Sequence, residues 1–437
     1  MRIAIYHGSF ATEAGGGEVA ALRAAKALIE AGHEVDLYTS LVDKKVMQLI
    51  YENANIYLPP KIIDISTTNS FMKIFKILSN KHMLSSLWAI NEYKNAAKDI
   101  LSKINGLSKE YDILIAKQSP ALISAIDILP GDITYFHYPS TLIGLIFLDK
   151  YIPDSAMPFV ILYKKFIISM EHKILMNVIC NNEVNINIYK IAAGNTWTKN
   201  GLLKINLPIL KILPDICRHK FIRPLTSVSV VYEPIEYETY SSRYDPNTKK
   251  RLVLTVSRYT PGKNLWSIIY VASRIPEAHF VIAGTTRAHS SAKVVAQLES
   301  LIDKLRAKNV TLEKDVPKKR LIDLYSEAMI YLHPLYTEHF GIAIAEGAAA
   351  GAVPVVYKDG GGWLDIASKI DPMLGYTTIN EAVTIVRRLL SSKELWLSLS
   401  KKSVKVASEF SWENYKKRLN AVVNEAYEIK RRSTHHS

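Results

Sequence analysis

The chain has little cysteine: of its 437 residues only Cys180 and Cys217 are cysteines. One pair in so long a chain provides neither a disulfide framework nor a clustered zinc site, so we expect a reducing compartment. Long hydrophobic runs are missing too, because no stretch of about 18 apolar residues exists to span a bilayer. The opening segment MRIAIYHGSF turns polar early and lacks the apolar core of a signal peptide. We therefore expect a cytoplasmic protein.

Acidic side chains are also scarce relative to basic ones. The sequence holds 55 Lys and Arg against 41 Asp and Glu, a formal net charge of +14. Such an excess attracts anionic partners, for example phosphorylated substrates or an anionic membrane face, and a solubilising surface is the equal alternative. Nucleic-acid binding ranks last, because the chain has no recognisable nucleic-acid module and no tract of interleaved aromatic and basic residues.

Two segments combine lysines with an apolar stripe at helical spacing. They are FMKIFKILSNKHMLSSLW, residues 71–88, and FVILYKKFIISMEHKILM, residues 159–176. Helices of this kind lie at membrane interfaces, but helices that pack one face on a core have the same pattern. For each segment alone we favour the core helix.

The first half of the chain alternates apolar runs with helical patterns. Residues 2–8 form an apolar run, a glycine-rich loop and a helical pattern follow, and residues 33–40 give a second strand. This order is a β-α-β opening, and the buried runs 111–118 and 132–139 continue it. We therefore predict a doubly wound parallel sheet in a first domain, residues 1–238.

A polar segment with proline and serine, residues 239–250, interrupts this alternation. Beyond it the α/β pattern restarts with about five strands, which predicts a second parallel-sheet domain over residues 239–410. Residues 411–432 begin with a serine N-cap candidate and form a terminal helix, expected to cross back to the first domain, and residues 433–437 are a tail. Two such domains would face a central cleft lined by the carboxyl ends of their strands.

The loop EAGGGEVA is a candidate ligand loop. Gly15, Gly16 and Gly17 remove side chains just before a helix start, so that an anion or a sugar could approach the backbone amides. The spacing is not the dinucleotide pattern G-x-G-x-x-G, and a structural turn is an equal alternative.

Two further strand ends carry polar side chains. In VSRYTPGKN, Arg258 and Lys263 flank a Pro-Gly turn and could converge on a diphosphate, or be two solvated charges. DITYFHYPS places His137 at the end of an apolar strand, where it could bind a sugar hydroxyl, carry a proton or be purely structural.

The stretch TEHFGIAIAEGAAAG gives the strongest signal. Glu338 lies in the loop before an apolar helix, near the amides of Phe340, Gly341 and Ile342, which can hold a phosphate or a sugar oxygen. Glu346 lies eight residues later inside the same apolar helix, where an unpaired charge would be costly. The two vicinal hydroxyls of a ribose would satisfy this second carboxylate.

Taken in order, these segments resemble retaining glycosyltransferase family 4. The E-x7-E stretch resembles its donor-site motif, SRYTPGKN its diphosphate clamp, and GGGE its N-terminal glycine loop. AGGGE, HYPS, GNTWT, TEHFGI and GGGWLDI are similar to the mannosyltransferases that extend the lipid-linked oligosaccharide of N-glycan assembly from GDP-mannose. The resemblance implies the GT-B fold, an α/β arrangement of two Rossmann-like doubly wound parallel-sheet domains facing a central cleft.

The resemblance also implies roles in donor binding. Arg258 and Lys263 would bind the donor diphosphate, and Glu346 would bind the ribose. Glu338, with the amides of residues 340–342, would hold the transferred sugar. We thus expect an enzyme that moves a hexose, with mannose as the expected sugar, and retains the configuration at its anomeric carbon.

On the acceptor side, Gly16 and Gly17 would approach donor and acceptor, and His137 would contact the sugar near the reacting centre. The catalytic candidates that the resemblance implies are therefore His137, Glu338, Arg258 and Lys263. No D-x-D lies in a loop suited to hold a metal on the diphosphate, so no essential metal and no cofactor are expected. The acceptor would be a glycan or a lipid-linked glycan, reached by peripheral contact with the cytoplasmic membrane face.

Two other functions remain open at this stage. One is a family 4 transferase that uses a UDP-sugar and a soluble acceptor. The other is a catalytically silent subunit that binds a sugar nucleotide while a partner performs the chemistry.

Overall fold

The structure, a computed structural model, describes residues 1–8, 10, 16–39, 42–43, 47–48, 51, 61–64, 102–104, 106–117, 131–137, 188–202, 227–287, 290–334 and 336–434. Both cysteines, Gly15 and the two segments 71–88 and 159–176 lie outside these residues. The chain divides into two compact units. Unit 1 comprises Met1–Gly194, Thr198–Val231 and Lys416–Ser437, and unit 2 comprises Asn195–Trp197 and Tyr232–Tyr415.

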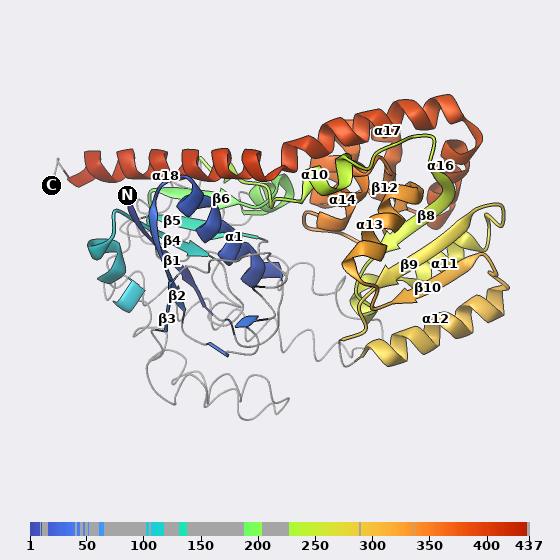
Figure 1. Cartoon of the computed structure of the whole chain (residues 1–437), viewed down its shortest axis with the longest axis horizontal. Coiled ribbons are helices and arrows are strands. Elements are labelled where there is room, and N and C mark those ends of the chain that lie inside the picture. The colour runs from blue at the N-terminus through green and yellow to red at the C-terminus, as the bar shows by residue number, and fades with distance from the viewer. Residues whose placement is uncertain are drawn as a thin grey trace, which may run out of the picture. The chain divides into compact units, whose positions relative to one another are not determined.

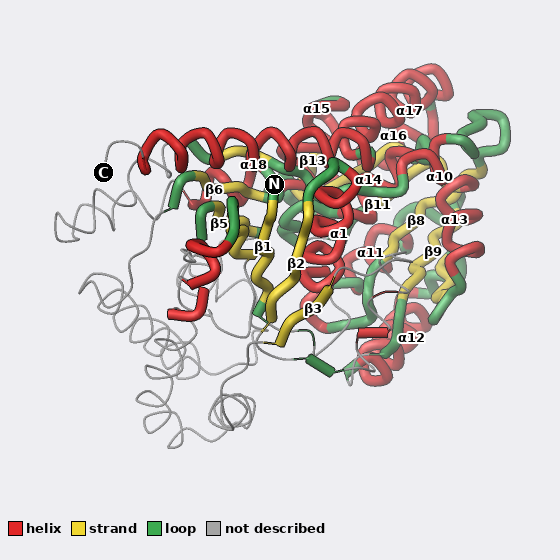
Figure 2. Tube along the Cα trace, turned by 60° about the vertical axis from the view of Figure 1, so that its left-hand side comes forward, coloured by secondary structure: helices red, strands yellow, loops and turns green. Residues whose placement is uncertain are grey.

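In the described part of unit 1, seven strands form one parallel sheet in the order β3-β2-β1-β4-β5-β6-β7. They are β1 (Arg2–His7), β2 (Glu34–Thr39), β3 (Lys61–Asp64), β4 (Ile113–Lys117), β5 (Ile133–Phe136), β6 (Lys190–Ala193) and β7 (Ser229–Val230). Figure 2 shows β1, β2 and β3 side by side. The chain runs outward from β1 to β3 and then returns to β4, so the sheet is doubly wound.

Burial explains why these runs form strands. All five residues of β4 and five of the six residues of β1 are buried, as expected for parallel strands covered on both faces. Lys117, the last residue of β4, is fully buried, but its Nζ donates to the carbonyl oxygen of Ala20 at 2.9 Å and lies 4.1 Å from the ring centroid of Tyr135. The strand therefore accommodates a cation at its carboxyl end.

Helix α1 (Gly16–Glu30) follows β1, and the terminal helix α18 (Trp412–Thr434) completes unit 1. Ser411 precedes α18 and its Oγ accepts from the amide of Asn414 at 3.4 Å, so the predicted N-cap is confirmed. From Lys416 onward the helix groups with unit 1, and Figure 1 shows it running along β5 and β6. Lys430 of α18 forms an ion pair of 2.9 Å with Asp132, just before β5.

Unit 2 contains a second parallel sheet, with six described strands in the order β10-β9-β8-β11-β12-β13. The strands are β8 (Lys250–Val256), β9 (His279–Gly284), β10 (Val310–Lys314), β11 (Ala328–Leu332), β12 (Val353–Tyr357) and β13 (Gly375–Tyr376). The longer helices are α11 (Trp266–Ala272), α12 (Ser291–Leu305), α13 (Lys318–Glu327), α14 (Ile342–Ala349), α16 (Ile379–Ser391) and α17 (Lys393–Ala407). Short helical turns are α10 (Tyr237–Ser241), η1 (Pro261–Lys263), η2 (Gly362–Ala367), α15 (Ser368–Ile370), η3 (Pro372–Leu374) and η4 (Ser408–Phe410).

Small residues let α14 pack closely in unit 2. A Cβ on Gly347 would lie 3.1 Å from the ring of Tyr331 on β11, so a larger residue would push the helix away from the sheet. Gly351, just after the helix, has a φ of +81°, which favours glycine, and its carbonyl oxygen accepts from Ser400 Oγ of α17 at 2.6 Å. The alanine and glycine pattern thus fixes the height of α14 above the strands.

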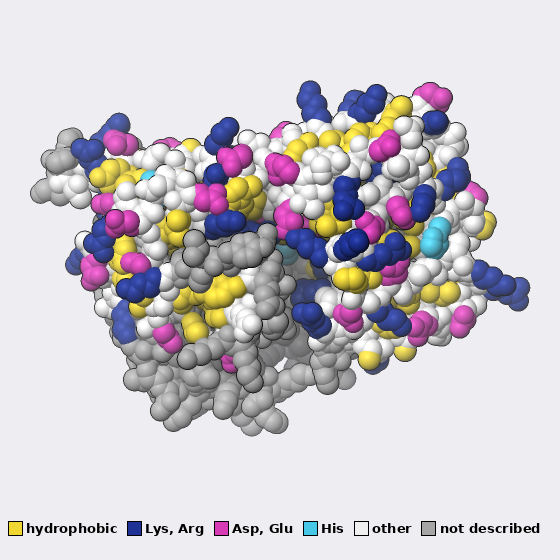
Figure 3. All heavy atoms as spheres, in the orientation of Figure 1, with side chains coloured by type: hydrophobic (Ala, Val, Ile, Leu, Met, Phe, Trp, Pro, Cys, Tyr) yellow, Lys and Arg dark blue, Asp and Glu magenta, His cyan; other side chains and the backbone are white. Residues whose placement is uncertain are grey.

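Acidic and basic side chains are interleaved on the face of the molecule seen in Figure 3. In unit 2, Lys318 pairs with Glu236 at 2.6 Å and Arg243 pairs with Asp323 at 2.8 Å, all on the surface. This pattern is typical of a solubilising surface. Among the described residues, no helix combines the length and the apolar character that crossing a membrane requires.

Candidate active site

The order of the strands places the predicted residues at one edge of each sheet. In unit 2, the chain winds from β8 outward through β9 and β10, and then from β11 outward through β12 and β13. β8 and β11 are therefore neighbours at the point where the winding direction changes, and ligands of such sheets bind at the carboxyl ends of these strands. Lys263 follows β8, and Glu338 follows β11.

The segment after β8 is anchored by Tyr259. This side chain is fully buried, and its hydroxyl donates to the carbonyl oxygen of Ile282 on β9 at 2.6 Å. The neighbouring Arg258 is exposed. Pro261 then opens η1, and Asn264, in the left-handed region with φ of 47°, ends it. Lys263 is thereby held on a short rigid turn.

Lys263 and Glu338 form an ion pair. The Lys263 Nζ lies 2.9 Å from Glu338 Oε2, and the side chains are 23% and 19% exposed. The other oxygen, Oε1, accepts from the amide of His339 at 3.1 Å. Both carboxylate oxygens therefore have a donor, and the partly buried charge is neutralised.

The ion pair keeps Glu338 ionised. Burial would raise the pKa of this carboxyl, but the Lys263 ammonium, with smaller contributions from His333 and His339, lowers the pKa to about 2. His333 lies on the same side, with its Nε2 3.8 Å from Glu338 Oε2. Glu338 is thus a permanent carboxylate near neutral pH and is unsuited to act as a general acid.

Two glycines after β12 hold the loop of Glu338. The amide of Gly361 donates to the carbonyl oxygens of Glu338 and His339 at 2.9 and 2.8 Å. A Cβ on Gly360 would lie 2.1 Å from the Glu338 carbonyl oxygen, and one on Gly361 would lie 2.0 Å from that of His339. Only glycine permits this approach, so Gly360 and Gly361 fix the backbone that carries the carboxylate.

Helix α14 begins directly after this loop. Gly341 precedes it with φ of 89°, and its carbonyl oxygen accepts from the amides of Ile344 and Ala345. None of the described hydrogen bonds uses the amides of Phe340, Gly341 or Ile342. These groups lie at the positive end of the helix, where an anion or a sugar oxygen is favoured.

The carboxylate of Glu346 is held by a hydrogen bond from helix α13. Its Oε2 accepts from the hydroxyl of Tyr325 on α13 at 3.1 Å. Burial raises the pKa of Tyr331, and the charges of both Glu338 and Glu346 raise it further. Both carboxylates therefore lie within electrostatic reach of a single phenol, whose hydroxyl donates to the carbonyl oxygen of Val256 at the end of β8.

Two aspartates after β12 bond to side chains and backbone from other segments at this edge of unit 2. Asp359 accepts from Thr337 Oγ1 at 3.0 Å and from Trp197 Nε1 at 3.1 Å. Asp365 accepts from the amide of Thr196 at 2.9 Å, from its hydroxyl, and from Tyr232 at 3.0 Å. Residues 195–197 are thus bonded to the segments that hold Glu338.

The unit 1 candidates gather at the carboxyl edge of its sheet. Gly16 and Gly17 open α1, and His137 follows β5, with its carbonyl oxygen accepting from Thr198 Oγ1 at 3.0 Å. His7 ends β1 and is fully buried, and a Cβ on Gly17 would lie 3.8 Å from its ring. Burial, Lys117 and His137 lower the pKa of His7 to about 3, so it is neutral.

Comparison with known proteins finds a family match in the second half of the chain. Residues 236–404 match the family described as Glycosyl transferases group 1. GDP-Man:Man(3)GlcNAc(2)-PP-Dol alpha-1,2-mannosyltransferase of Dictyostelium discoideum is 25% identical over 240 residues, which cover 52% of this chain and 45% of that protein. The protein of the same name from Homo sapiens is 28% identical over 200 residues, covering 42% and 41%. The chain therefore matches less than half the length of these relatives.

The whole chain also resembles solved structures. HepE of Anabaena in complex with UDP aligns with a TM-score of 0.62 at 14% identity, over 97% of this chain and 100% of that chain. This likeness shows the fold. The fold is GT-B. The two Rossmann-like parallel sheets predicted from the sequence are confirmed.

Several residues at these edges were not predicted as site residues. His7, His333 and Asp359 end apolar runs and carry no spacing signal, and Asp365 appeared only within GGGWLDI. The glycines beside Asp359 were the one available clue, because such a run permits close backbone approach. Among the described residues no group of three or more His, Cys, Asp and Glu could hold a metal ion.

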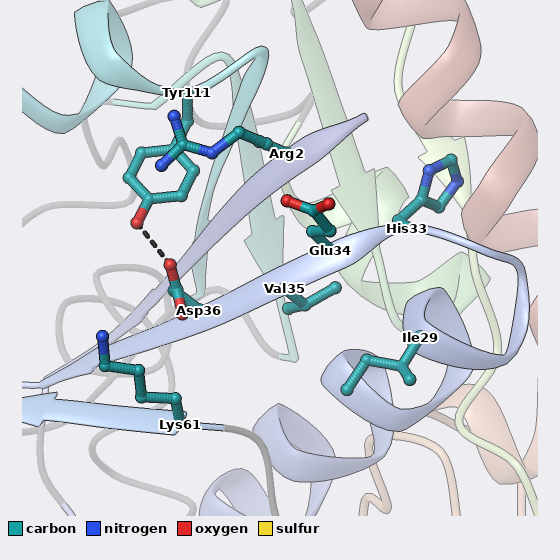
Figure 4. A pocket seen from close by; sticks show the side chains of 8 residues that line it. All are labelled: Arg2, Ile29, His33, Glu34, Val35, Asp36, Lys61 and Tyr111. Atoms are coloured by element: carbon teal, nitrogen blue, oxygen red, sulfur yellow. Dashed lines mark hydrogen bonds between the residues drawn. The ribbon is translucent and has the colours of Figure 1, made fainter.

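One pocket of unit 1 lies away from all predicted residues. It has a volume of about 440 Å³ and is drawn in Figure 4. Arg2, Glu34 and Lys61 open β1, β2 and β3, so the pocket lies at the amino edge of the sheet. The Tyr111 hydroxyl donates to Asp36 there, and Arg2 covers the Tyr111 ring at 4.9 Å. The pocket is thus at the opposite edge from His7 and His137.

Proposed function

We propose that this chain is a retaining glycosyltransferase of family 4 that transfers mannose from GDP-mannose to a hydroxyl of a glycan or lipid-linked glycan. The observation that carries the proposal is the Lys263–Glu338 pair beside the unused amides of residues 340–342. A cation, a permanent carboxylate and a positive helix end are the groups that a sugar diphosphate requires.

Donor binding would distribute these groups along the nucleotide. Lys263 and Arg258 would neutralise the diphosphate, and Glu346 would accept from the ribose hydroxyls. Glu338 would accept from hydroxyls of the transferred sugar, since its low pKa keeps it an acceptor near neutral pH. The amides of residues 340–342 would donate to the sugar or the phosphate.

Transfer would occur on one face of the sugar. The bond between the anomeric carbon and the diphosphate oxygen breaks, the acceptor oxygen bonds to the same face, and the hydroxyl proton passes to the departing phosphate. Lys263 and Arg258 would stabilise the negative charge that develops on the leaving group. In unit 1, His137 would contact the sugar near the reacting centre, and Gly16 and Gly17 would approach donor and acceptor.

The proposed donor and acceptor are taken from the names of the relatives. The Dictyostelium discoideum and Homo sapiens proteins are named as GDP-Man transferases that act on Man(3)GlcNAc(2)-PP-Dol. A UDP-sugar with a soluble acceptor is the second candidate, because the structure of HepE contains UDP. Contact with an anionic membrane face stays a prediction, and its candidate segments 71–88 and 159–176 lie outside the described residues.

A thermal-shift screen followed by a transfer assay tests the proposal. GDP should raise the melting temperature more than UDP or ADP, because a ligand that binds only the folded state stabilises it. GDP-mannose with a panel of lipid-linked acceptors should then give a product whose new bond keeps the donor's anomeric configuration. A larger shift with UDP would favour the second candidate, and an inverted product would refute retention.

Site variants separate binding from folding. Lys263→Met and Glu338→Ala should reduce transfer by about a hundredfold or more, the loss typical for one charge-stabilising group. Lys318→Met is the matched control, because Lys318 also forms an ion pair in unit 2 but is 58% exposed on the surface. A fully active Lys263→Met enzyme would rule out the diphosphate role of that lysine.

A further inference from the structure

His333 occupies a fixed position beside the ion pair. It directly follows β11, its amide donates to the carbonyl oxygen of Val355 at 2.9 Å, and its own carbonyl oxygen accepts from the Tyr376 hydroxyl. The backbone is therefore held by β12 and by the strand beside it. The ring can turn about its own bonds, but its attachment point cannot move.

The imidazole of His333 is buried without a hydrogen-bond partner. The residue is 5% exposed, and neither Nδ1 nor Nε2 forms a hydrogen bond within the described part of the chain. Buried polar atoms are almost always paired, so an unpaired ring needs a reason. It has a charged neighbour in Glu338, whose Oε2 lies 3.8 Å from Nε2.

That carboxylate oxygen is already occupied. Glu338 Oε2 accepts from Lys263 Nζ at 2.9 Å, and 3.8 Å is too long for a hydrogen bond from His333. The structure therefore has one acceptor oxygen and two possible donors. The ammonium is bonded to this oxygen, and the imidazole nitrogen lies 3.8 Å from it.

A ligand phosphate would change this balance. Lys263 is a compact charge on a flexible stem, so it can turn from Glu338 toward a phosphate. Glu338 cannot follow, because its loop is bonded to Gly361 and its Oε1 to the amide of His339. The carboxylate, only 19% exposed, would then lack a donor on Oε2.

We propose that His333 is a positioning residue that donates to Glu338 when Lys263 turns to a ligand phosphate, and so keeps the carboxylate oriented toward the sugar. This inference rests on the proposed function, since it requires a phosphate ligand at Lys263. It predicts that His333 takes up a proton when the ligand binds and donates as an imidazolium to Glu338.

The charges that face His333 give the sign of the effect. Burial and the Lys263 ammonium lower the pKa of His333, and Glu338 raises it, with a net value of about 4. When Lys263 is removed or turned to a phosphate, Glu338 remains and the opposing cation is weakened. The pKa of His333 must then rise, and the ring takes up a proton at a higher pH than before.

A titration without ligand tests the electrostatic part. The chain has 12 histidines, and selective isotope labelling of their rings with NMR detection would follow each one, with His333 assigned by its loss in His333→Gln. In the full-length wild type His333 should not titrate between pH 5 and 8. In Lys263→Met its pKa should rise by about 1–3, as expected for a histidine left beside a carboxylate. Lys318→Met should leave it unchanged.

Lys263→Gln provides a second variant if the methionine variant does not fold. Unchanged signals from the other histidines would show that the fold is intact. A His333 pKa that stays below 5 in both folded Lys263 variants would overturn the proposal.

Calorimetry of GDP binding tests the ligand-linked part. Titrations in two buffers of different ionisation enthalpy give the protons taken up per GDP, and the comparison of wild type with His333→Phe removes the contribution of GDP itself. Wild type should take up more protons than His333→Phe near pH 5.5, and GDP affinity should fall in the variant. Equal proton uptake in both proteins would overturn the role of His333 alone, whereas no binding of GDP or UDP to wild type would overturn the proposed function and this inference with it.

Discussion

The ion pair of Lys263 and Glu338 should contribute measurably to the stability of unit 2. We expect the double-mutant cycle of Lys263→Met and Glu338→Gln to give a coupling of about 1–3 kcal/mol at pH 7. The upper limit comes from the pKa of Glu338, which lies near 2 instead of the ordinary 4.5. A difference of about 2.5 in pKa corresponds to about 3 kcal/mol. The coupling is smaller because His333 and His339 contribute, and because water screens side chains that are 23% and 19% exposed.

The pH dependence has a definite sign. The pKa of Glu338 is lower in the folded state than in the unfolded state, so its stabilisation is complete above about pH 4.5 and is lost as the pH falls toward 2. At pH 3 about 2 kcal/mol of that stabilisation should already be gone. The coupling measured at pH 3 must therefore be smaller than at pH 7.

Urea unfolding followed by tryptophan fluorescence is a suitable assay. Of the six tryptophans, five belong to unit 2: Trp197, Trp266, Trp363, Trp396 and Trp412. The exposed pair of Lys318 and Glu236 gives the control cycle, expected at less than about 1 kcal/mol. A coupling below about 0.3 kcal/mol for Lys263 and Glu338 at pH 7, or one that does not shrink at pH 3, would refute the reasoning.

Three further predictions concern the surroundings of the site. Gly361→Ala should destabilise unit 2 by about 3 kcal/mol or more in the same assay, because its Cβ would lie 2.0 Å from the His339 carbonyl oxygen. In the control Gly262→Ala the new Cβ meets nothing within 4 Å, so this variant should lose less than about 0.5 kcal/mol. Equal effects of the two substitutions would contradict the close packing at Gly361. Tyr325→Phe removes a donor to Glu346 and should cost about 1 kcal/mol, and a neutral result would show that the bond is not stabilising. Burial lowers the pKa of His7 to about 3, so the unfolded state binds more protons between pH 6.5 and 3, and stability decreases as the pH is lowered through this range. His7→Phe should flatten this slope in acid unfolding followed by circular dichroism, by up to about 1.4 kcal/mol per pH unit, and an unchanged slope would contradict a neutral buried histidine.

The strands of both sheets were predictable where they form long apolar runs. Residues 111–118 contain β4 and residues 2–8 contain β1, because strands buried on both faces need near-continuous apolar side chains. The two-residue strands β7 and β13 were not predicted as separate elements, since two residues carry no periodicity. They exist because neighbouring strands offer them free backbone groups.

The pairing of Lys263 with Glu338 shows what the sequence leaves open. Lys263 was predicted after a strand and Glu338 in the loop before a helix, and both were assigned to donor binding. That they meet at 2.9 Å depends on β8 and β11 being neighbours. Strand order depends on how the connecting helices pack, so it cannot be read from the local pattern of either segment.

His333 and Asp365 were missed for a different reason. A histidine at the end of MIYLHP and an aspartate within WLDIA both read as parts of apolar elements. Their chemistry depends on partners far along the chain: Thr196 and Tyr232 for Asp365, and Lys263, which is bonded to the nearby Glu338, for His333. A local sequence pattern can predict a charged residue at the end of a strand. It cannot predict which group from another part of the chain will contact that residue.

Glu338, in the loop before α14, and Glu346, within α14, are held by different contacts, and this decides which groups a ligand can move. Glu338 lies on backbone bonded to Gly361, and Glu346 is bonded to Tyr325 on another helix. Neither carboxylate needs a ligand to fix its position, so their orientation is established during folding. Lys263, on a flexible side chain, is the group in this set that can change partner at low cost. Phosphate binding at this edge of unit 2 should therefore shift the lysine and leave both glutamates where they are.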